Sequence, residues 1–151
     1  MPPLDDELAC PNLKRHAPDA YRALAALTRS GHPDHTVSEL VKLRASQMND
    51  CRTCQGIHTD LMERSGETPE RIAAVADWRG SERFSPAERA ALALAEEVTR
   101  GPLTAGTATE VGRHFGEDGL SRLVATALAI NAWNRATLAS EVCEELHAGV
   151  G

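Results

Sequence analysis

Helix-start and helix-stop signals recur along this sequence from residue 19 to the end. Ala, Leu, Glu and Arg dominate the segments between them, and no segment alternates apolar and polar residues around β-branched positions. We therefore expect an all-α bundle of about six to seven helices joined by short turns. With 151 residues, the chain is expected to form a single domain over residues 1–151, with a core over about 18–147 and an N-terminal extension over 1–17.

Capping residues predict where most of these helices begin. Thr68 and Ser85 each combine an N-cap side chain with a proline at the first helical position. Thr36 and Glu39 have the spacing of a capping box. The expected helices cover residues 20–31, 37–48, 51–66 (after a cap at Asn49 or Asp50), 70–78, 87–101, a short segment from Thr107 or Thr109 to about Gly116, and 118–147, the last as one helix or as two joined near 131–134.

The charge balance excludes several classes of partner. The net charge is −6, from 16 basic and 22 acidic residues, and no basic run is present, so we expect no nucleic-acid partner. The longest apolar stretch, residues 123–133, is too short and too rich in Ala to span a bilayer, and the N-terminus has no signal-peptide pattern. We therefore expect no membrane partner and a cytoplasmic location, where cysteines are free or redox-active rather than structural.

Three reactive side chains fall within eight positions of the predicted helix over residues 51–66. Cys51, Cys54 and His58 have the spacing i, i+3 and i+7, which places them on one face. Ile57, Leu61 and Met62 flank that face, so we expect it to point into the bundle.

This spacing has direct chemical consequences for the two thiols. Side chains at i and i+3 have Cβ atoms about 5–6 Å apart, so a modest adjustment closes a disulfide between Cys51 and Cys54. Such a short loop stabilises the fold by only about 2 kcal/mol, which favours reversible redox chemistry over a structural role. The first helical turn favours a thiolate, and His58 is in reach of Cys54 to accept its proton.

Other interpretations of the cysteine pair stay open at this point. A zinc site needs a fourth ligand, and the sequence has no second CxxC. A haem site of the CxxCH type is excluded because residue 55 is Gln. Simple packing of small residues is the third alternative. Cys10 and Cys143 lie near the termini and are expected to be bystanders.

Glu39 lies twelve residues before Cys51, and the residues alone favour a capping role for it with Thr36. The alternative is a buried carboxylate that orients His58 and tunes its basicity. Further along the chain, Trp133 is expected to anchor a core or an interface. The nearby Asn131, Asn134 and Arg135 are expected to hydrogen-bond to neighbouring helices.

Glu39, Cys51, Cys54 and His58 together resemble the AhpD-like alkylhydroperoxidases of the carboxymuconolactone decarboxylase superfamily. The shared pattern in "ELVKLRASQMNDCRTCQGIH" is a glutamate, eleven residues, CxxC, three residues and a histidine. The resemblance continues over the segments 65–99 and 128–135. It therefore covers most of the chain between about Pro18 and Arg135.

The resemblance implies an all-helical domain that forms homo-oligomers, often trimers or hexamers, with the cysteine helices at a subunit interface. It implies hydroperoxide or disulfide reduction in which Cys54 is the peroxidatic thiol, Cys51 the resolving thiol, His58 the base and Glu39 its relay partner. Better-studied peroxidase members carry a histidine between the two cysteines, where this chain has Thr53. The decarboxylase branch lacks the cysteine pair.

We therefore expect a thiol-dependent peroxidase without a metal or organic cofactor. Its partners would be a hydroperoxide substrate and a thiol electron donor, which can be a lipoyl-bearing or peroxiredoxin-type protein. The alternatives are a thiol–disulfide oxidoreductase acting on a protein or lipoyl partner, a cofactor-free decarboxylase or isomerase using Glu39 and His58 as acid and base, and a non-catalytic oligomeric binding protein.

Overall fold

The structure is a computed structural model that describes the backbone of residues 11–148 and the side chains as far as residue 141. Seven α helices and one 3₁₀ helix make up this part of the chain, so the all-α prediction is confirmed. The elements are α1 (Leu13–His16), α2 (Pro18–Arg29), α3 (His35–Met48), α4 (Arg52–Arg64), α5 (Pro69–Ala74), η1 (Val75–Gly80), α6 (Pro86–Arg100) and α7 (Ala105–Ala148). Cys10 and the side chain of Cys143 lie outside the described residues.

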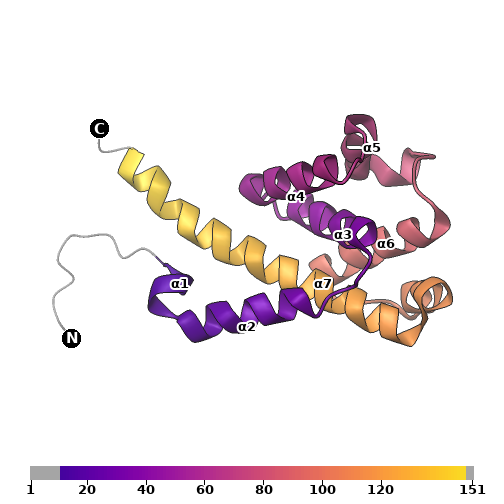
Figure 1. The fold of residues 1–151 in the computed structure, drawn as a ribbon, viewed down its shortest axis with the longest axis horizontal. Coiled ribbons are helices and arrows are strands. Elements are labelled where there is room, and N and C mark those ends of the chain that lie inside the picture. The colour runs from indigo at the N-terminus through magenta and orange to yellow at the C-terminus, as the bar shows by residue number, and fades with distance from the viewer. Residues whose placement is uncertain (1–10, 149–151) are drawn as a thin grey trace.

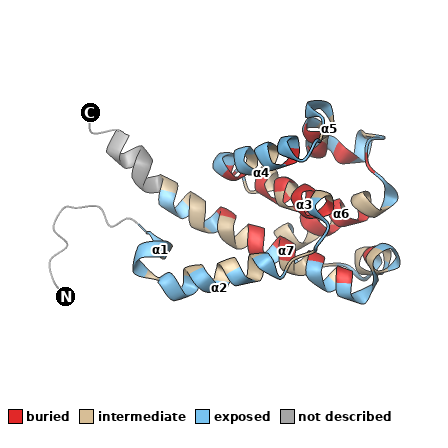
Figure 2. Ribbon diagram, viewed as in Figure 1, coloured by how far each residue is buried: buried red, intermediate tan, exposed pale blue. Residues whose placement is uncertain are grey.

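Helix α3 is the centre of the bundle. It contacts α4, α6 and α7, and α2 packs along α7 on the opposite side from α4 (Figure 1). The second half of α7 continues well beyond the other helices (Figure 1). Buried residues concentrate in α3, α6 and the middle of α7, whereas α2 and the outer side of α4 are exposed (Figure 2).

Two apolar clusters share α3. The first joins α3, α6 and α7, and the second joins α3, α4, α5, η1 and α6. Because α3 supplies both clusters, eight of its residues are buried, and its buried surface extends around most of the helix. The first cluster consists of Val37, Val41, Ala90, Ala91, Leu94, Ala95, Val111, Leu123 and Ala127; the second consists of Leu40, Leu43, Met62, Ile72, Val75, Trp78, Phe84 and Leu92.

The caps of α5 and α6 are those predicted, at Thr68 and Ser85. The predicted cap of α3 at Thr36 is wrong. Asp34 is the N-cap, and its carboxylate accepts a hydrogen bond from the backbone N–H of Val37 at 2.9 Å. The helix therefore begins at residue 35, and Glu39 falls in its second turn, beyond the reach of a capping box.

The beginning of α4 also differs from the prediction. Asp50 adopts a left-handed conformation with φ of 52° and ends the turn after α3, so neither it nor Asn49 caps α4. Cys51 takes the N-cap position instead, and its sulfur accepts the backbone N–H of Cys54 at 3.3 Å. The pair therefore stands at the very start of α4.

The last segment contains the predicted short helix followed by a long one, although the short helix begins earlier than Thr107. The first turn of α7 begins at Ala105, where the Thr104 hydroxyl accepts the N–H of Thr107 at 3.3 Å. A bend interrupts the helix at Gly116, whose φ of 70° favours glycine. Beyond it, one continuous helix passes through residues 131–134. Within the described residues, no helix is long and apolar enough to cross a membrane.

Candidate active site

The start of α4 carries the cysteine pair. Cys51 and Cys54 are joined by a disulfide with a Cα–Cα distance of 5.3 Å, as the i, i+3 spacing predicts. Cys51 has no exposed surface, and Cys54 is 4% exposed. The predicted burial of the helix face is correct for these residues and for Met62, but it is wrong for Ile57 and Leu61, which are exposed. Helix α4 lies at the edge of the bundle, so one flank of its apolar face stays open.

Glu39 on α3 reaches across to α4. Its Oε2 lies 2.7 Å from Nδ1 of His58, and the glutamate is only 2% exposed. The capping role favoured by the residues alone is therefore wrong, because Asp34 has taken over the cap. The structure brings together Glu39, His58 and the Cys51–Cys54 pair.

Lys42 is a member of this group that the sequence did not predict. It lies one turn after Glu39 on α3, and its Nζ is 2.9 Å from Glu39 Oε1. The i, i+3 spacing of an acidic and a basic residue is the only signal that could have indicated it. Each oxygen of the Glu39 carboxylate thus has its own partner.

The electrostatic environment keeps Glu39 ionised. Burial acts to raise its pKa, but the hydrogen bonds from His58 and Lys42 and their positive charges outweigh burial, so the pKa of Glu39 lies below its ordinary value. An ionised carboxylate only accepts hydrogen bonds, so Nδ1 of His58 must carry the proton. In the neutral imidazole, Nε2 is then free to accept a proton from another group.

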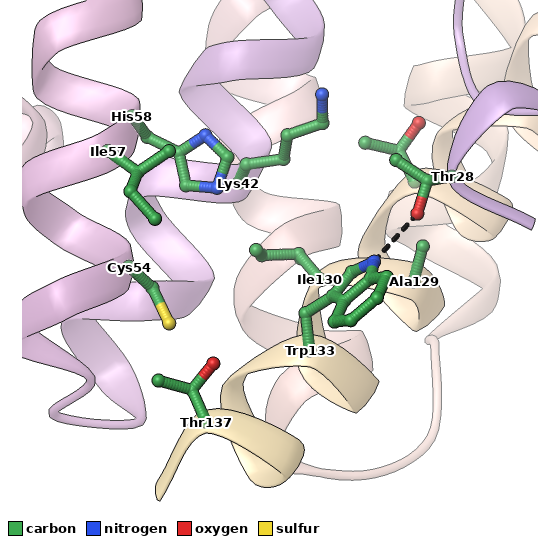
Figure 3. Close-up of a pocket in the computed structure, with 10 residues that line it drawn as sticks. Thr28, Lys42, Cys54, Ile57, His58, Ala129, Ile130, Trp133 and Thr137 are labelled. Atoms are coloured by element: carbon green, nitrogen blue, oxygen red, sulfur yellow. Dashed lines mark hydrogen bonds between the residues drawn. The ribbon is translucent and has the colours of Figure 1, made fainter. Parts of the chain in front are cut away.

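A cavity of about 240 Å³ opens beside these residues, between α2, α3, α4 and α7. Cys54 and His58 project into it from α4, and Ile130 and Trp133 face them from α7 (Figure 3). Cys51 does not line this cavity. The complete lining is Thr28, Lys42, Cys54, Ile57, His58, Thr126, Ala129, Ile130, Trp133 and Thr137. A small molecule in the cavity would therefore meet Cys54 rather than Cys51.

The far wall of the cavity is held in place by polar contacts. Trp133 donates its indole N–H to the hydroxyl of Thr28 at 2.8 Å, which joins α7 to α2, as Figure 3 shows. One turn of α7 also binds the α3–α4 turn, because the side-chain amide of Asn49 donates to Asn131 and Asn134 at 2.8 and 2.9 Å. The predicted hydrogen-bonding role is confirmed for these two asparagines, whereas Arg135, the third residue of that prediction, is exposed. These contacts fix α7 relative to the cysteine helix.

Thr53, between the two cysteines, has a structural contact with α7. Its hydroxyl donates to Oε1 of Glu141 at 2.7 Å. Thr53 is exposed and does not line the cavity. In the part of the chain whose side chains are described, no three His, Cys, Asp or Glu residues converge in an arrangement suited to a metal ion.

The sequence matches a known protein family over more than half of its length. The model of the carboxymuconolactone decarboxylase family matches residues 15–97, which is more than half of the chain and includes Glu39, Cys51, Cys54 and His58. The chain belongs to this family. Membership also agrees with the AhpD-like resemblance of the motif and with the helical fold.

Several known proteins and solved structures are similar to this chain over most of its length. YdfG of Bacillus subtilis, an uncharacterised protein, is 36% identical over 115 residues, 74% of this chain and 78% of YdfG. The crystal structure of an Agrobacterium tumefaciens protein of unknown function, described as a candidate antioxidant defence protein AhpD, superposes with a TM-score of 0.78 at 27% identity, covering 89% of this chain and 96% of that one. The debrominase Bmp8 shares the fold, with a TM-score of 0.72 at 20% identity over 82% of this chain and 70% of its own.

Proposed function

We propose that this protein is a thiol-dependent peroxidase that reduces organic hydroperoxides through the Cys51–Cys54 pair. One observation carries the proposal: Cys54 lines a cavity together with His58, which is hydrogen-bonded to the buried carboxylate of Glu39. A thiol, a base and an acid that orients the base are the parts of an activated sulfur nucleophile. The family membership and the AhpD-like neighbour support the same chemistry.

In the first step, Nε2 of His58 takes the proton of the Cys54 thiol, and the thiolate attacks the terminal oxygen of the hydroperoxide. The O–O bond breaks, Cys54 becomes a sulfenic acid, and the departing alkoxide takes the proton from His58 and leaves as an alcohol. The Cys51 thiol then attacks the Cys54 sulfur, which releases water and forms the disulfide. An external dithiol restores both thiols by exchange and ends as its own disulfide. No metal or organic cofactor takes part in these steps.

Burial supports the assignment of Cys54 as the attacking thiol and limits the electron donor. Cys51 has no exposed surface, so a donor thiol would have to reach Cys54 through the cavity. A lipoyl group on a flexible arm meets this requirement better than a flat protein surface. We therefore favour a lipoyl-bearing protein over a peroxiredoxin-type protein as the proposed donor. A thiol–disulfide oxidoreductase would use the same steps without the peroxide.

Peroxide turnover in the presence of dithiothreitol tests the proposal. We expect the Cys54→Ser variant to lose consumption of cumene hydroperoxide. The Cys51→Ser variant, reduced beforehand and freed of dithiothreitol, should stop after one equivalent, because no thiol then recycles its sulfenic acid. Cys10→Ser serves as the control for a thiol outside the CxxC motif and should keep the wild-type rate. Consumption that survives Cys54→Ser would overturn the assignment, and turnover of a lactone acid by the double cysteine variant would favour an acid–base decarboxylase or isomerase.

We also propose that the protein is a homo-oligomer, a trimer or a hexamer. Ile57 and Leu61 lie one turn apart on α4 and are 52% and 37% exposed, which is unusual for large apolar residues at neighbouring positions. Light scattering after size-exclusion chromatography measures the mass directly. If the wild type has the mass of a monomer, and the Ile57→Lys and Leu61→Lys variants have the same mass, an assembly through this face is ruled out.

A further inference from the structure

Lys42 lines the cavity although the CxxC-to-histidine pattern does not include it. Of the 16 basic residues, only Lys14 and Lys42 are lysines. We propose that Lys42 is a positioning residue that holds Glu39 for His58 and balances the charge of the carboxylate, and that the neutral, mostly apolar cavity beside it takes uncharged hydroperoxides. The substrate part of this inference rests on the proposed peroxidase function.

The positioning role follows from how the carboxylate is shared. Lys42 Nζ holds Oε1 of Glu39 at 2.9 Å, and His58 Nδ1 holds Oε2 at 2.7 Å. With Oε1 engaged, rotation of the carboxylate away from His58 would break the ion pair with Lys42. The imidazole is therefore held with Nδ1 toward α3, and its Nε2 is the nitrogen left for the cavity that it shares with Cys54.

Charge counting supports the choice of substrate. Among the residues that line the cavity, α2 and α7 contribute no charged group, and α4 contributes only Cys54 and His58 as groups that titrate. The charge of Lys42 cancels that of Glu39. The net charge of the site is therefore zero when Cys54 is a thiol and His58 is neutral, and it is also zero when Cys54 is a thiolate and His58 is an imidazolium. A substrate with a carboxylate would add one uncompensated negative charge to a mostly apolar cavity, which is unfavourable.

Two of the three threonines that line the cavity are already engaged with the protein. Thr28 accepts from the indole of Trp133 and donates to the carbonyl of Leu24. Thr126 donates to the carbonyl of Arg122 and accepts the N–H of His32. Lys42, by contrast, has three N–H donors and one hydrogen-bond partner among the described side chains. Its remaining donors can serve the oxygens of an uncharged ligand.

The size of the cavity favours a compact ligand. At about 240 Å³, it is larger than the roughly 150 Å³ cavity that accepts benzene and smaller than the roughly 300 Å³ at which drug-sized pockets begin. The substrate class is therefore a compact, uncharged organic hydroperoxide with a branched alkyl or single-ring body. Cumene hydroperoxide is a suitable probe of this class.

Three substitutions separate the charge of Lys42 from its hydrogen bond. Lys42→Arg keeps both, Lys42→Gln keeps a donor without the charge, and Lys42→Met removes both; Lys14→Met, on exposed α1, is the matched control. The readout is the pH dependence of alkylation of reduced Cys54 by iodoacetamide, followed by mass spectrometry of the Cys54 peptide. We expect the midpoint to rise by about one pH unit in the Gln and Met variants and to stay near wild type in the Arg and Lys14 variants.

The ratio of alkylation by neutral iodoacetamide to that by anionic iodoacetate measures the charge of the site directly. It should rise about tenfold in the Gln and Met variants, the size expected for one charge acting in a partly dry site. Circular dichroism checks that each variant is folded, and the Gln variant keeps the test valid if the Met variant is not. An unchanged midpoint and an unchanged ratio in a folded Gln variant would overturn the inference.

Hydroperoxide turnover completes the test with a matched substrate pair. The wild type should consume cumene hydroperoxide at least tenfold faster than the analogue with a para-carboxylate. Equal rates would contradict the selection of uncharged substrates. Loss of all turnover in the wild type, with the alkylation shifts still present, would overturn the peroxidase function and leave the role of Lys42 standing.

Discussion

Two buried glutamates in this bundle have the same chemistry and different surroundings. Glu39 is 2% exposed and Glu96 is 1% exposed, and hydrogen bonds from cationic partners hold both pKa values below the ordinary value although burial acts to raise them. The partners of Glu96 are Arg44, Arg79 and Trp78, at 2.6–3.0 Å. None of these groups gives up a proton near neutral pH.

Glu39 differs in the kind of partner it has and in what lies behind that partner. One partner of Glu39 is the imidazole of His58, a side chain that commonly serves as a general acid or base, and it shares a cavity with Cys54. Glu96 joins α3, η1 and α6 and lines none of the described cavities. The difference teaches that burial and a lowered pKa do not by themselves mark a functional carboxylate. Glu39 is distinguished as a functional carboxylate by its histidine partner and by the cavity that adjoins this partner.

The largest expected effect is on stability, at Glu96. The Glu96→Ala change removes the buried carboxylate that Trp78 and the partly buried Arg44 both bind, so we expect the free energy of unfolding to fall by about 3 kcal/mol, at the low end for broken buried ion pairs. Denaturant unfolding measures this change. The control is Glu110→Ala, which removes the exposed pair with Arg113 and should cost less than about 0.5 kcal/mol. Similar losses for both variants would contradict the structural role of Glu96.

The next effect is on catalysis, at Glu39. The Glu39→Gln change keeps the shape of the side chain but cannot stabilise an imidazolium at His58, so peroxide turnover should fall about 100-fold. Steady-state kinetics on the folded variant give the value. Glu96→Gln is the matched control, and its turnover should stay within about threefold of wild type. A comparable loss of turnover in both variants would erase the distinction between the two glutamates.

Acidification should affect both glutamates in the same direction. Because their folded-state pKa values are lowered, the stability they contribute is present above the ordinary value of 4.5 and is lost as the pH falls through the folded-state values. The free energy of unfolding, measured from pH 7 to pH 3, should therefore decrease. In the Glu96→Gln variant this decrease with falling pH should be smaller. Stability that increases as the pH falls from 5 to 3 would be inconsistent with these lowered values.

The smallest expected effect is at Thr53. Replacement by Val removes its hydrogen bond to Glu141 but leaves both cysteines and His58 in place, so stability should fall by at most about 1 kcal/mol. Turnover should not change, because Thr53 does not line the cavity. Thermal unfolding and peroxide kinetics measured on one preparation test both statements. A severalfold drop in turnover would give Thr53 a part in the chemistry that its position does not suggest.

Local signals were sufficient to predict most of the fold. The helix starts at Thr68 and Ser85 and the disulfide across one helical turn depend on residues a few positions apart, which a sequence displays directly. The start of α3 was mispredicted because two capping candidates, Asp34 and Thr36, lie two residues apart and only one can begin the helix. That shift also gave Glu39 a capping role that it does not have.

The site depends on contacts that local patterns do not display. The Glu39–His58 hydrogen bond joins residues 19 positions apart. The residues themselves offered it only as the less favoured alternative to a capping role, and the family resemblance then selected it. The cavity wall requires Trp133 to meet Thr28 across 105 positions, so neither the cavity nor the place of Lys42 in it could be predicted. The cavity and the place of Lys42 in its wall both result from the packing of α2 and α7 around α3.

Trapping of the first oxidation product tests the central claim most directly. The reduced Cys51→Ser variant lacks the resolving thiol, so one equivalent of cumene hydroperoxide should add a single oxygen to Cys54, and the further change Glu39→Gln should slow this step about 100-fold. Mass spectrometry of the cysteine peptides locates the oxygen. Oxidation of Cys51 in the Cys54→Ser variant at the same rate, or no oxidation of Cys54 at all, would contradict the account.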